Sequence, residues 1–180
     1  MHDGTFGDKR MDDASKLWTL WNEREINLLM LQFGRGLDLH DWSLYEACFL
    51  DEFEVDFHDL TGAPVVRVNA SLWAEFARVV LEPLKVHHQY SNHVVTFADD
   101  DHASSVLYHV SHHFKPTSRG ASTNYQYGWY ENQYLRTAAG WRISRLCHRF
   151  QWVDGNDGLL TVTSPQAAEI TARVFGGART

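Results

Sequence analysis

The stretch HASSVLYHVSHHFK, residues 102–115, is one of four long segments rich in Val, Tyr, Phe, Trp or Thr, the residues that favour β-strands. The four predicted strands are residues 88–98, 102–115, 123–136 and 141–153. Only short turn-like links separate them, so consecutive strands are expected to pair antiparallel as a meander. Because each strand exceeds the usual length of about five or six residues, we expect one strongly curved, twisted sheet.

The residues before this region have the period of helices. Apolar side chains fall on one face of a helix that begins near residue 15 and ends near Leu37. Two further helices are predicted after the N-cap residues Asp41 and Ser71, and alternation in residues 52–58 predicts a strand between them. This order indicates an α+β fold, and three helices against the concave side of the sheet would enclose a pocket for a small ligand.

The chain divides into three parts. Residues 1–14 are polar and acidic, and we expect them to form a flexible N-terminal arm. Residues 15–153 carry the predicted helices and strands and form a single domain. Residues 154–180 form a C-terminal tail with a last helix around residues 165–174.

Composition excludes several classes of protein. The chain has 180 residues, 44% of them hydrophobic, which suits one domain with a sizeable core. Its net charge of −7 and the lack of a basic stripe argue against nucleic acid as a partner. No apolar stretch is long enough to span a membrane, and the N-terminus lacks the apolar region of a signal peptide. The two cysteines fit a reducing cytoplasm, which is the compartment we expect.

Eleven histidines are the unusual feature, and most of them lie between residues 87 and 113. No two histidines are spaced by two on a strand, and His109 and His113 would be about 13 Å apart at ~3.3 Å per residue. We therefore expect no metal site, although ligands from different strands could still converge. Motifs for nucleotide, phosphate or zinc-protease chemistry are absent, so no cofactor is expected.

Acid–base chemistry is the other use for a histidine, because an imidazole exchanges protons near neutral pH. A nearby carboxylate would fix its tautomer and stabilise the imidazolium. Asp38 is the candidate carboxylate, because it follows the apolar face of the first helix between Leu37 and Leu39. The sequence leaves two interpretations open: a carboxylate buried for a purpose, or part of an ordinary helix-ending turn.

Several short segments resemble the scytalone dehydratase family, within the SnoaL-like branch of the nuclear transport factor 2-like superfamily. The resembling segments are residues 37–42, 53–57, 88–92, 110–112 and 140–143. Their order and spacing match over residues 15–153. The resemblance implies a cone-shaped α+β barrel with a deep pocket and no cofactor. It also implies that Asp38 orients His88 as the general base, with His112 as a second acid–base or substrate-binding group.

The resemblance has departures that bear on the substrate. Where scytalone dehydratases carry pocket tyrosines, this sequence has Leu37 and Phe57, so scytalone itself is a doubtful substrate. Tyr90, Tyr108, Tyr125 or Tyr127 could replace them from the sheet. The candidate substrate contacts are Phe57, Tyr90, Asn92, Tyr108, Trp129 and Arg149. A solvent-facing position is the alternative for Arg149, and a place in the core or an interface is the alternative for Trp129.

The favoured function is a cofactor-independent lyase or isomerase, similar to a dehydratase, that acts on a small, largely apolar cyclic or carbonyl-bearing molecule. The alternatives are the non-catalytic small subunit of a ring-hydroxylating dioxygenase and a module that binds a small ligand. Aromatic residues occur on both faces of residues 123–153, more than one concave face can bury. We therefore expect a homo-oligomer, a dimer or trimer, built on the exposed face of the sheet.

Overall fold

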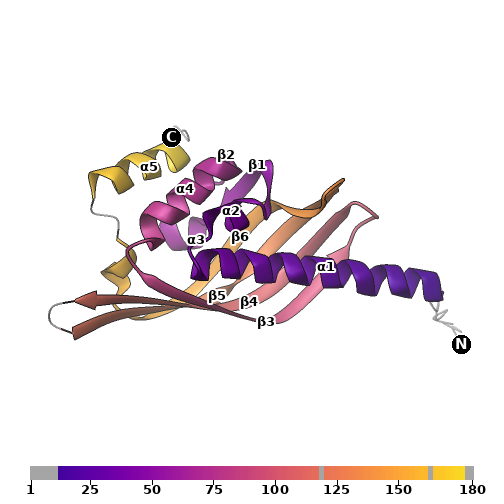
Figure 1. Ribbon diagram of the computed structural model, residues 1–180, viewed down its shortest axis with the longest axis horizontal. Helices are drawn as coiled ribbons and strands as arrows, with labels where there is room; N and C mark the ends of the chain where they lie inside the picture. Colours follow the sequence, from indigo (N-terminus) through magenta and orange to yellow (C-terminus); the bar gives the residue numbers. More distant parts are fainter. Residues whose placement is uncertain (1–11, 118–119, 162–163, 177–180) are drawn as a thin grey trace, which may run out of the picture.

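The computed structural model of the chain describes residues 12–117, 120–161 and 164–176, and it has a long helix lying along a curved sheet (Figure 1). The elements in chain order are α1 (Asp13–Asp38), α2 (Trp42–Glu46), β1 (Phe49–Asp56), α3 (His58–Thr61), β2 (Val66–Asn69), α4 (Ala70–Leu81), β3 (Lys85–Phe97), β4 (His102–Thr117), β5 (Gly120–Thr137), β6 (Gly140–Gly155), η1 (Asp157–Leu160) and α5 (Pro165–Phe175). The predicted N-terminal arm lies almost entirely outside the described residues.

The sheet has six strands in the order β2-β1-β6-β5-β4-β3. Strands β3 to β6 form the predicted antiparallel meander, and β1 joins β6 in parallel. The prediction of an α+β fold with a curved, mostly antiparallel sheet is confirmed. The sheet does not close into a barrel, because β2 and β3 are its two edges. Strand β2 was not predicted; it is a four-residue edge strand that pairs only with β1.

Helix α1 begins two residues before the predicted start, behind Asp12, whose carboxylate accepts a hydrogen bond from the Ser15 backbone N–H at 2.7 Å. Its two C-terminal glycines allow close packing. A Cβ on Gly34 would lie 2.6 Å from Cε2 of Tyr90 on β3. A Cβ on Gly36 would lie 2.8 Å from Cβ of Tyr45 on α2. Glycine at these positions lowers helix propensity but brings α1 against both neighbours.

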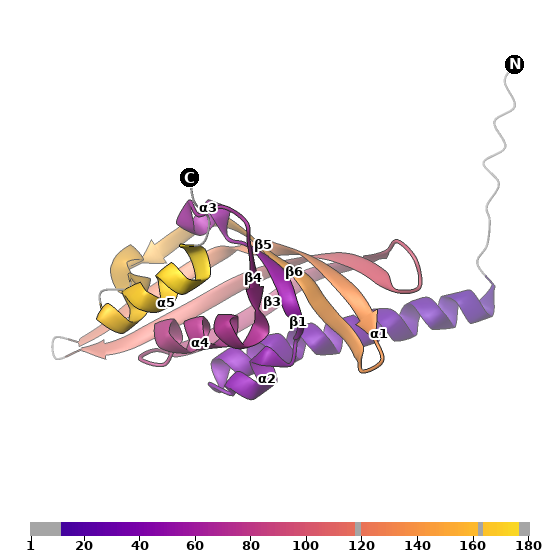
Figure 2. The same ribbon diagram turned by 90° about the horizontal axis from the view of Figure 1, so that it is seen from above.

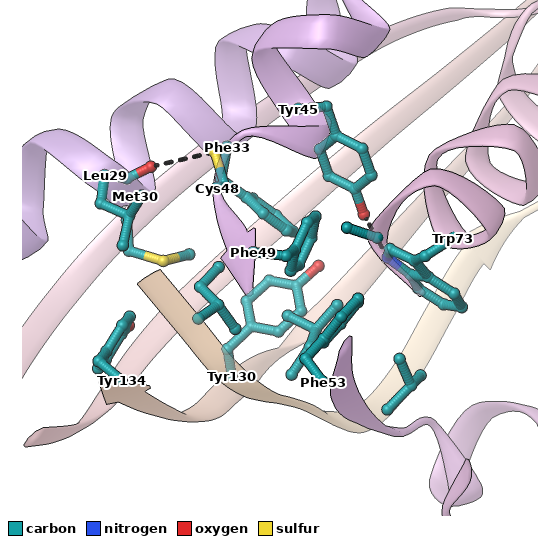
Figure 3. Close-up of a cluster of buried hydrophobic side chains, with 14 of the residues drawn as sticks. Leu29, Met30, Phe33, Tyr45, Cys48, Phe49, Phe53, Trp73, Tyr130 and Tyr134 are labelled. Atoms are coloured by element: carbon teal, nitrogen blue, oxygen red, sulfur yellow. Dashed lines mark hydrogen bonds between the residues drawn. The ribbon is translucent and has the colours of Figure 1, made fainter. Parts of the chain in front are cut away.

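The core is aromatic and lies between α1, α2, β1 and α4 (Figure 3). Phe33 is at its centre, with ring centroids 5.1 Å from Tyr45, 6.0 Å from Phe49 and 5.7 Å from Tyr130. Phe49 stacks on Phe53 at 4.3 Å. These contacts fix the end of α1 against the middle of the sheet, which is where the site lies.

The two faces of the sheet carry alternate residues. On β4 the odd-numbered residues from Ala103 to His113 are buried and face the helices, whereas the even-numbered residues face outward. We call these the inner and the outer face. Strand β3 changes parity at a bulge, where Asn92 has a positive φ of 50° and the register with β4 shifts between Ser91 and Val94.

The C-terminal segment packs back onto the helical side of the molecule. Helix α5, predicted at residues 165–174, begins at Pro165 behind a Ser164 N-cap and lies beside α4 (Figure 2). The Phe175 ring contacts those of Trp73 and Phe76, at centroid distances of 6.5 and 5.6 Å. Helix α5 therefore contributes to the domain that residues 15–153 build.

Candidate active site

Asp38 and His88 form a close pair at the junction of α1 and β3. The Asp38 carboxylate oxygen Oδ1 lies 2.7 Å from Nδ1 of His88, within the range expected for a hydrogen bond. The backbone N–H of His88 also donates to both carboxylate oxygens, at 3.0 and 3.1 Å. The His88 side chain is only 5% exposed. The predicted contact is confirmed; its catalytic role is a proposal made below.

Asp38 is both a carboxylate held against His88 and part of the turn that ends α1. It is the last residue of α1, and the chain then turns by a Schellman motif: His40 N–H donates to the Leu37 carbonyl and Asp41 N–H to that of Gly36. His40 occupies the left-handed position at φ 54°, where glycine is usual. A carboxylate at a helix C-terminus faces the negative end of the helix dipole. The two donors of His88 offset that cost and hold the carboxylate in place.

A carboxylate acceptor fixes the tautomer of His88. Nδ1 carries a hydrogen that it donates to Asp38, so Nε2 keeps its lone pair. Nε2 makes no hydrogen bond to any described residue, and His88 lines the main pocket of the structure. The pair therefore presents a basic nitrogen to the pocket and can stabilise the positive charge that a captured proton would create.

The pocket has a volume of about 470 Å³ and lies between the sheet and the helices α1, α2, α4 and α5. Its wall is largely apolar. The polar side chains that the sheet contributes to the wall are His88, Ser111, His113, Gln126, Tyr130 and His148. The other polar lining residues, which lie outside the sheet, are Tyr45, Thr61, Asp157, Thr161 and Thr171. The lining contains no lysine or arginine among the residues that the structure describes. Such a wall suits a small, mostly apolar and uncharged molecule with a few polar groups.

The second histidine of the pocket is His113, not the predicted His112. His112 is on the outer face, where its ring contacts those of His87 and Tyr125. The bulge in β3 explains the difference. Near the hairpin Val94 pairs with Val106, a register that would place His112 opposite His88. The extra residue at the bulge brings Ser111 opposite His88 instead, so that His88 shares the inner face with the odd-numbered residues of β4.

His113 is held in one tautomer by its neighbours. The Asn124 side chain donates to the Asn156 carbonyl at 2.9 Å, which orients its amide oxygen toward Nδ1 of His113 at 3.2 Å. Nδ1 of His113 therefore carries a hydrogen, and Nε2 is an acceptor. Burial, together with the nearby His88, lowers the pKa of His113 to about 4. The ring is neutral at physiological pH.

Two more buried histidines, His148 in the pocket wall and His109 against it, were not singled out as site residues by the sequence. Their ring centroids are 4.8 Å apart. Burial lowers the pKa of His109 to about 2 and that of His148 to about 4. Both are therefore neutral in the folded protein. His109 and His113 are four residues apart on one strand, so their side chains lie on the same face. Once His113 was known to face the pocket, this spacing would have predicted an inner position for His109.

The predicted substrate contacts fall in different places. Phe57 lines the pocket. Tyr90 is on the inner face beside His88, but its hydroxyl is sealed from the pocket and has no hydrogen-bond partner in the described chain. Asn92 is exposed and forms the bulge.

The other three predicted contacts do not line the pocket. Tyr108 and Trp129 stack on each other on the outer face, with ring centroids 5.8 Å apart. Arg149, on the same face, donates to Glu131 at 2.9 Å. Glu131 also accepts from the Trp129 indole at 2.9 Å, so these two predicted contacts share one carboxylate on the outer face.

The described part of the chain offers no metal site. No group of three or more His, Cys, Asp or Glu residues within it is arranged to hold a metal ion. Among the same residues, no helix is long and apolar enough to cross a membrane.

Comparisons with known proteins agree with this architecture. A protein from Kribbella flavida is 26% identical, with a TM-score of 0.75 over 80% of this chain and 99% of its own. A Novosphingobium aromaticivorans protein provisionally assigned as a scytalone dehydratase is 17% identical, with a TM-score of 0.68 over 78% of this chain and 91% of its own. Hexachlorocyclohexane dehydrochlorinase from Novosphingobium barchaimii is 17% identical, with a TM-score of 0.63 over 83% of this chain and 99% of its own.

The last two likenesses are to chains of low identity and concern the fold alone. A search of curated proteins finds no match. The model of the SnoaL-like domain family matches residues 18–147, which include α1, most of the sheet and both members of the Asp38–His88 pair. By this match the chain belongs to the SnoaL-like domain family.

Proposed function

We propose that the protein is a cofactor-independent lyase or isomerase in which His88 is the general base and Asp38 its orienting partner. The observation that carries the proposal is the 2.7 Å contact between them beside an apolar pocket. Nε2 of His88 would take a proton from a carbon next to a carbonyl group. Asp38 would stabilise the imidazolium, which then returns the proton either to another carbon or to a departing hydroxyl group as water.

His113 is proposed as a second polar contact at the reacting end of the substrate, in place of His112. Its Nε2 is an acceptor in the tautomer that Asn124 selects. It would accept a hydrogen bond from a substrate hydroxyl or from a released water molecule. A pKa of about 4 makes it a poor base, so His113 would orient the substrate while His88 moves the proton.

The substrate would be a small, uncharged, largely apolar ring compound with a carbonyl group. The described wall of the pocket offers aromatic surface and hydrogen bonds but no cation to pair with a carboxylate or phosphate. A volume of about 470 Å³ falls within the range for drug-sized ligands.

The alternative of a non-catalytic small subunit accounts less well for the site. Such a subunit has no use for a carboxylate-supported histidine beside an open pocket. A ligand-binding module would use the pocket, but it gives no reason for the tautomer selection at His88. The two buried free cysteines are in keeping with the cytoplasmic location expected from the sequence.

A homo-oligomer also remains our proposal, with a second copy covering the outer face of the sheet. That face carries two aromatic stacks, Tyr108 on Trp129 and Tyr127 on Trp152, and exposes 43% of Tyr108 and 52% of Trp152. Light scattering on the purified protein would test it. A mass near 20.7 kDa at micromolar concentration would contradict it.

Proton abstraction can be tested before the natural substrate is known. The probe is 2-tetralone, a cyclic ketone with acidic C–H groups, and the measurement is its deuterium uptake in D₂O followed by NMR. We expect the protein to accelerate exchange and His88→Ala to lower the rate by about 10²–10⁴-fold. The matched control is His102→Ala, because His102 is paired with Asp99 on the surface. Equal rates for His88→Ala and the unmodified protein would refute the proposal.

A further inference from the structure

Four tyrosines lie on the inner side of the sheet, three of them buried and Tyr90 partly buried, and their hydroxyl groups have different surroundings. Tyr134 is paired with the Ser105 hydroxyl at 2.7 Å. The Tyr90 hydroxyl is sealed and unpartnered. Tyr45 and Tyr130 are the two that line the pocket. Their hydroxyls are therefore the ones that a bound molecule could reach.

The Tyr130 hydroxyl has no internal partner. It makes no hydrogen bond with any residue in the described parts of the chain. Unlike the Tyr90 hydroxyl, it is not sealed off by surrounding atoms. In Figure 3 it points into the space enclosed by the aromatic core residues. Buried polar groups almost always have a partner, so the contents of the pocket are what remains for this one.

The Tyr45 hydroxyl has one internal partner, which leaves its proton free. It accepts the indole N–H of Trp73 at 2.7 Å, and an indole can only donate. Tyr45 must therefore find an acceptor for its own O–H. Both tyrosine rings pack against Phe33, at 5.1 and 5.7 Å between centroids, and both line the same pocket.

We propose that Tyr45 and Tyr130 form a hydrogen-bond-donating subsite for one oxygen atom of the substrate, a carbonyl oxygen. This inference rests on the proposed function. Tyr90 links the subsite to the base, because its ring lies 6.4 Å from that of Tyr130 and 6.3 Å from that of His88. In the proposed binding mode the substrate carbonyl lies at the phenols and its neighbouring C–H group faces His88.

The chemistry of the two phenols suits this role. Burial raises the pKa of both Tyr45 and Tyr130 well above the usual 10, so each keeps its proton at neutral pH. When His88 removes the carbon-bound proton, the electron pair moves onto the carbonyl oxygen. Two fixed donors then stabilise the developing enolate without giving up their protons. Leu37 and Phe57 line the same pocket and offer no such donor.

The test compares two probes of nearly equal size, 2-acetylnaphthalene, which has a carbonyl group, and 2-ethylnaphthalene, which has none. Affinities are measured by quenching of tryptophan fluorescence. Tyr130→Phe removes no internal hydrogen bond, so the fold should be retained. We expect it to weaken binding of 2-acetylnaphthalene by about 3- to 10-fold and to leave binding of 2-ethylnaphthalene within about 2-fold. Tyr45→Phe should also lower the affinity for 2-acetylnaphthalene relative to that for 2-ethylnaphthalene.

Two variants separate this inference from its alternatives. Tyr127→Phe is the matched control, because that ring stacks on Trp152 on the outer face. His88→Ala should keep the preference for the carbonyl probe while losing proton exchange, so a failed base and a failed subsite give different results. The inference is overturned if the unmodified protein shows no carbonyl preference, if Tyr130→Phe weakens both probes equally, or if the preference is lost in Tyr90→Phe instead.

Discussion

The molecule contains two Asp–His pairs with nearly the same hydrogen bond and very different surroundings. Asp38 and His88 are 2.7 Å apart, and their side chains are 21% and 5% exposed. Asp99 and His102 are 2.9 Å apart in the turn between β3 and β4, and their side chains are 59% and 61% exposed. The carboxylate selects a tautomer in both. Only the first pair presents the opposite nitrogen to an apolar pocket, so burial rather than the contact itself makes it a candidate site.

The largest expected difference between the pairs is in proton exchange. Asp38→Asn keeps one oxygen acceptor for the His88 backbone, so the fold should survive. The new amide group can donate to Nδ1, which would move the hydrogen of His88 to Nε2 and remove the basic lone pair. We expect exchange of 2-tetralone to fall by about 10²–10³-fold, because the two residues act as a unit.

Asp99→Asn is the matched variant for that measurement, and its exchange rate should stay within about 2-fold of the unmodified protein. A pH profile adds a readout that general destabilisation would not move. If Asp38→Asn retains the full exchange rate at every pH, the orienting role of Asp38 is refuted.

A second difference is the response of stability to pH. Buried neutral histidines lie behind the first pair: His113 and His148 have pKa values lowered to about 4, and His109 to about 2. The unfolded chain takes up these protons near pH 6.5, so their stabilisation is complete above that pH and is lost as the pH falls toward 4. We expect the free energy of unfolding to drop by roughly 5 kcal/mol between pH 6.5 and 5, as measured by urea denaturation.

His148→Asn is the variant that sharpens this prediction, since it removes one proton-binding group from the set. The slope of stability against pH should become smaller by nearly one proton between pH 6 and 5. A slope unchanged in His148→Asn, or a stability that does not fall in this range, would show that these rings are already protonated or solvated.

The sequence predicted the sheet well because composition alone marks long strands, and it predicted the Asp38–His88 contact through the family resemblance. It missed the inner position of His113 because the bulge at Asn92 shifts the pairing of β3 with β4 by one residue, so that Ser111 and not His112 lies opposite His88. The alternation of apolar and polar residues along β4 does not reveal which of its faces is the inner one. The outward residues of β4 include Val106 and Tyr108, whereas the inward ones include Ser111 and His113, since a pocket wall is more polar than a core.

Other features depend on contacts between segments far apart in the sequence. Tyr130 resembles any aromatic residue on a strand until the fold shows that its hydroxyl has no internal partner. In the sequence Gly34 reads only as a residue that weakens a helix, and the Tyr90 ring that packs against it becomes visible only in the folded chain. The sheet stays open because its edge strands β2 and β3 do not pair with each other, which local patterns do not encode.

The packing around the buried pair supplies a third, smaller effect. Gly34→Ala would place a Cβ 2.6 Å from Cε2 of Tyr90, whose ring is enclosed beside His88. We expect a loss of about 1–3 kcal/mol in the free energy of unfolding from this overpacking. Gly158→Ala is the control, because its Cβ would meet nothing closer than 3.4 Å. Equal stability of the two variants would contradict the close packing described here.

The smallest effect should come from the surface pair. His102→Ala removes a contact in which both side chains are more than half exposed, and exposed ion pairs are worth little because solvent and salt screen them. Asp99 would keep its other hydrogen bonds, to the backbone N–H groups of Asp101 and His102 at 2.9 and 2.8 Å, so the turn should remain. We expect a change below about 0.5 kcal/mol in urea denaturation at pH 7, shrinking further in 1 M NaCl. A larger loss that persists in high salt would mean that hydrogen bonding to Asp99 stabilises the β3–β4 turn, and the contrast between the two pairs would then be one of position rather than of strength.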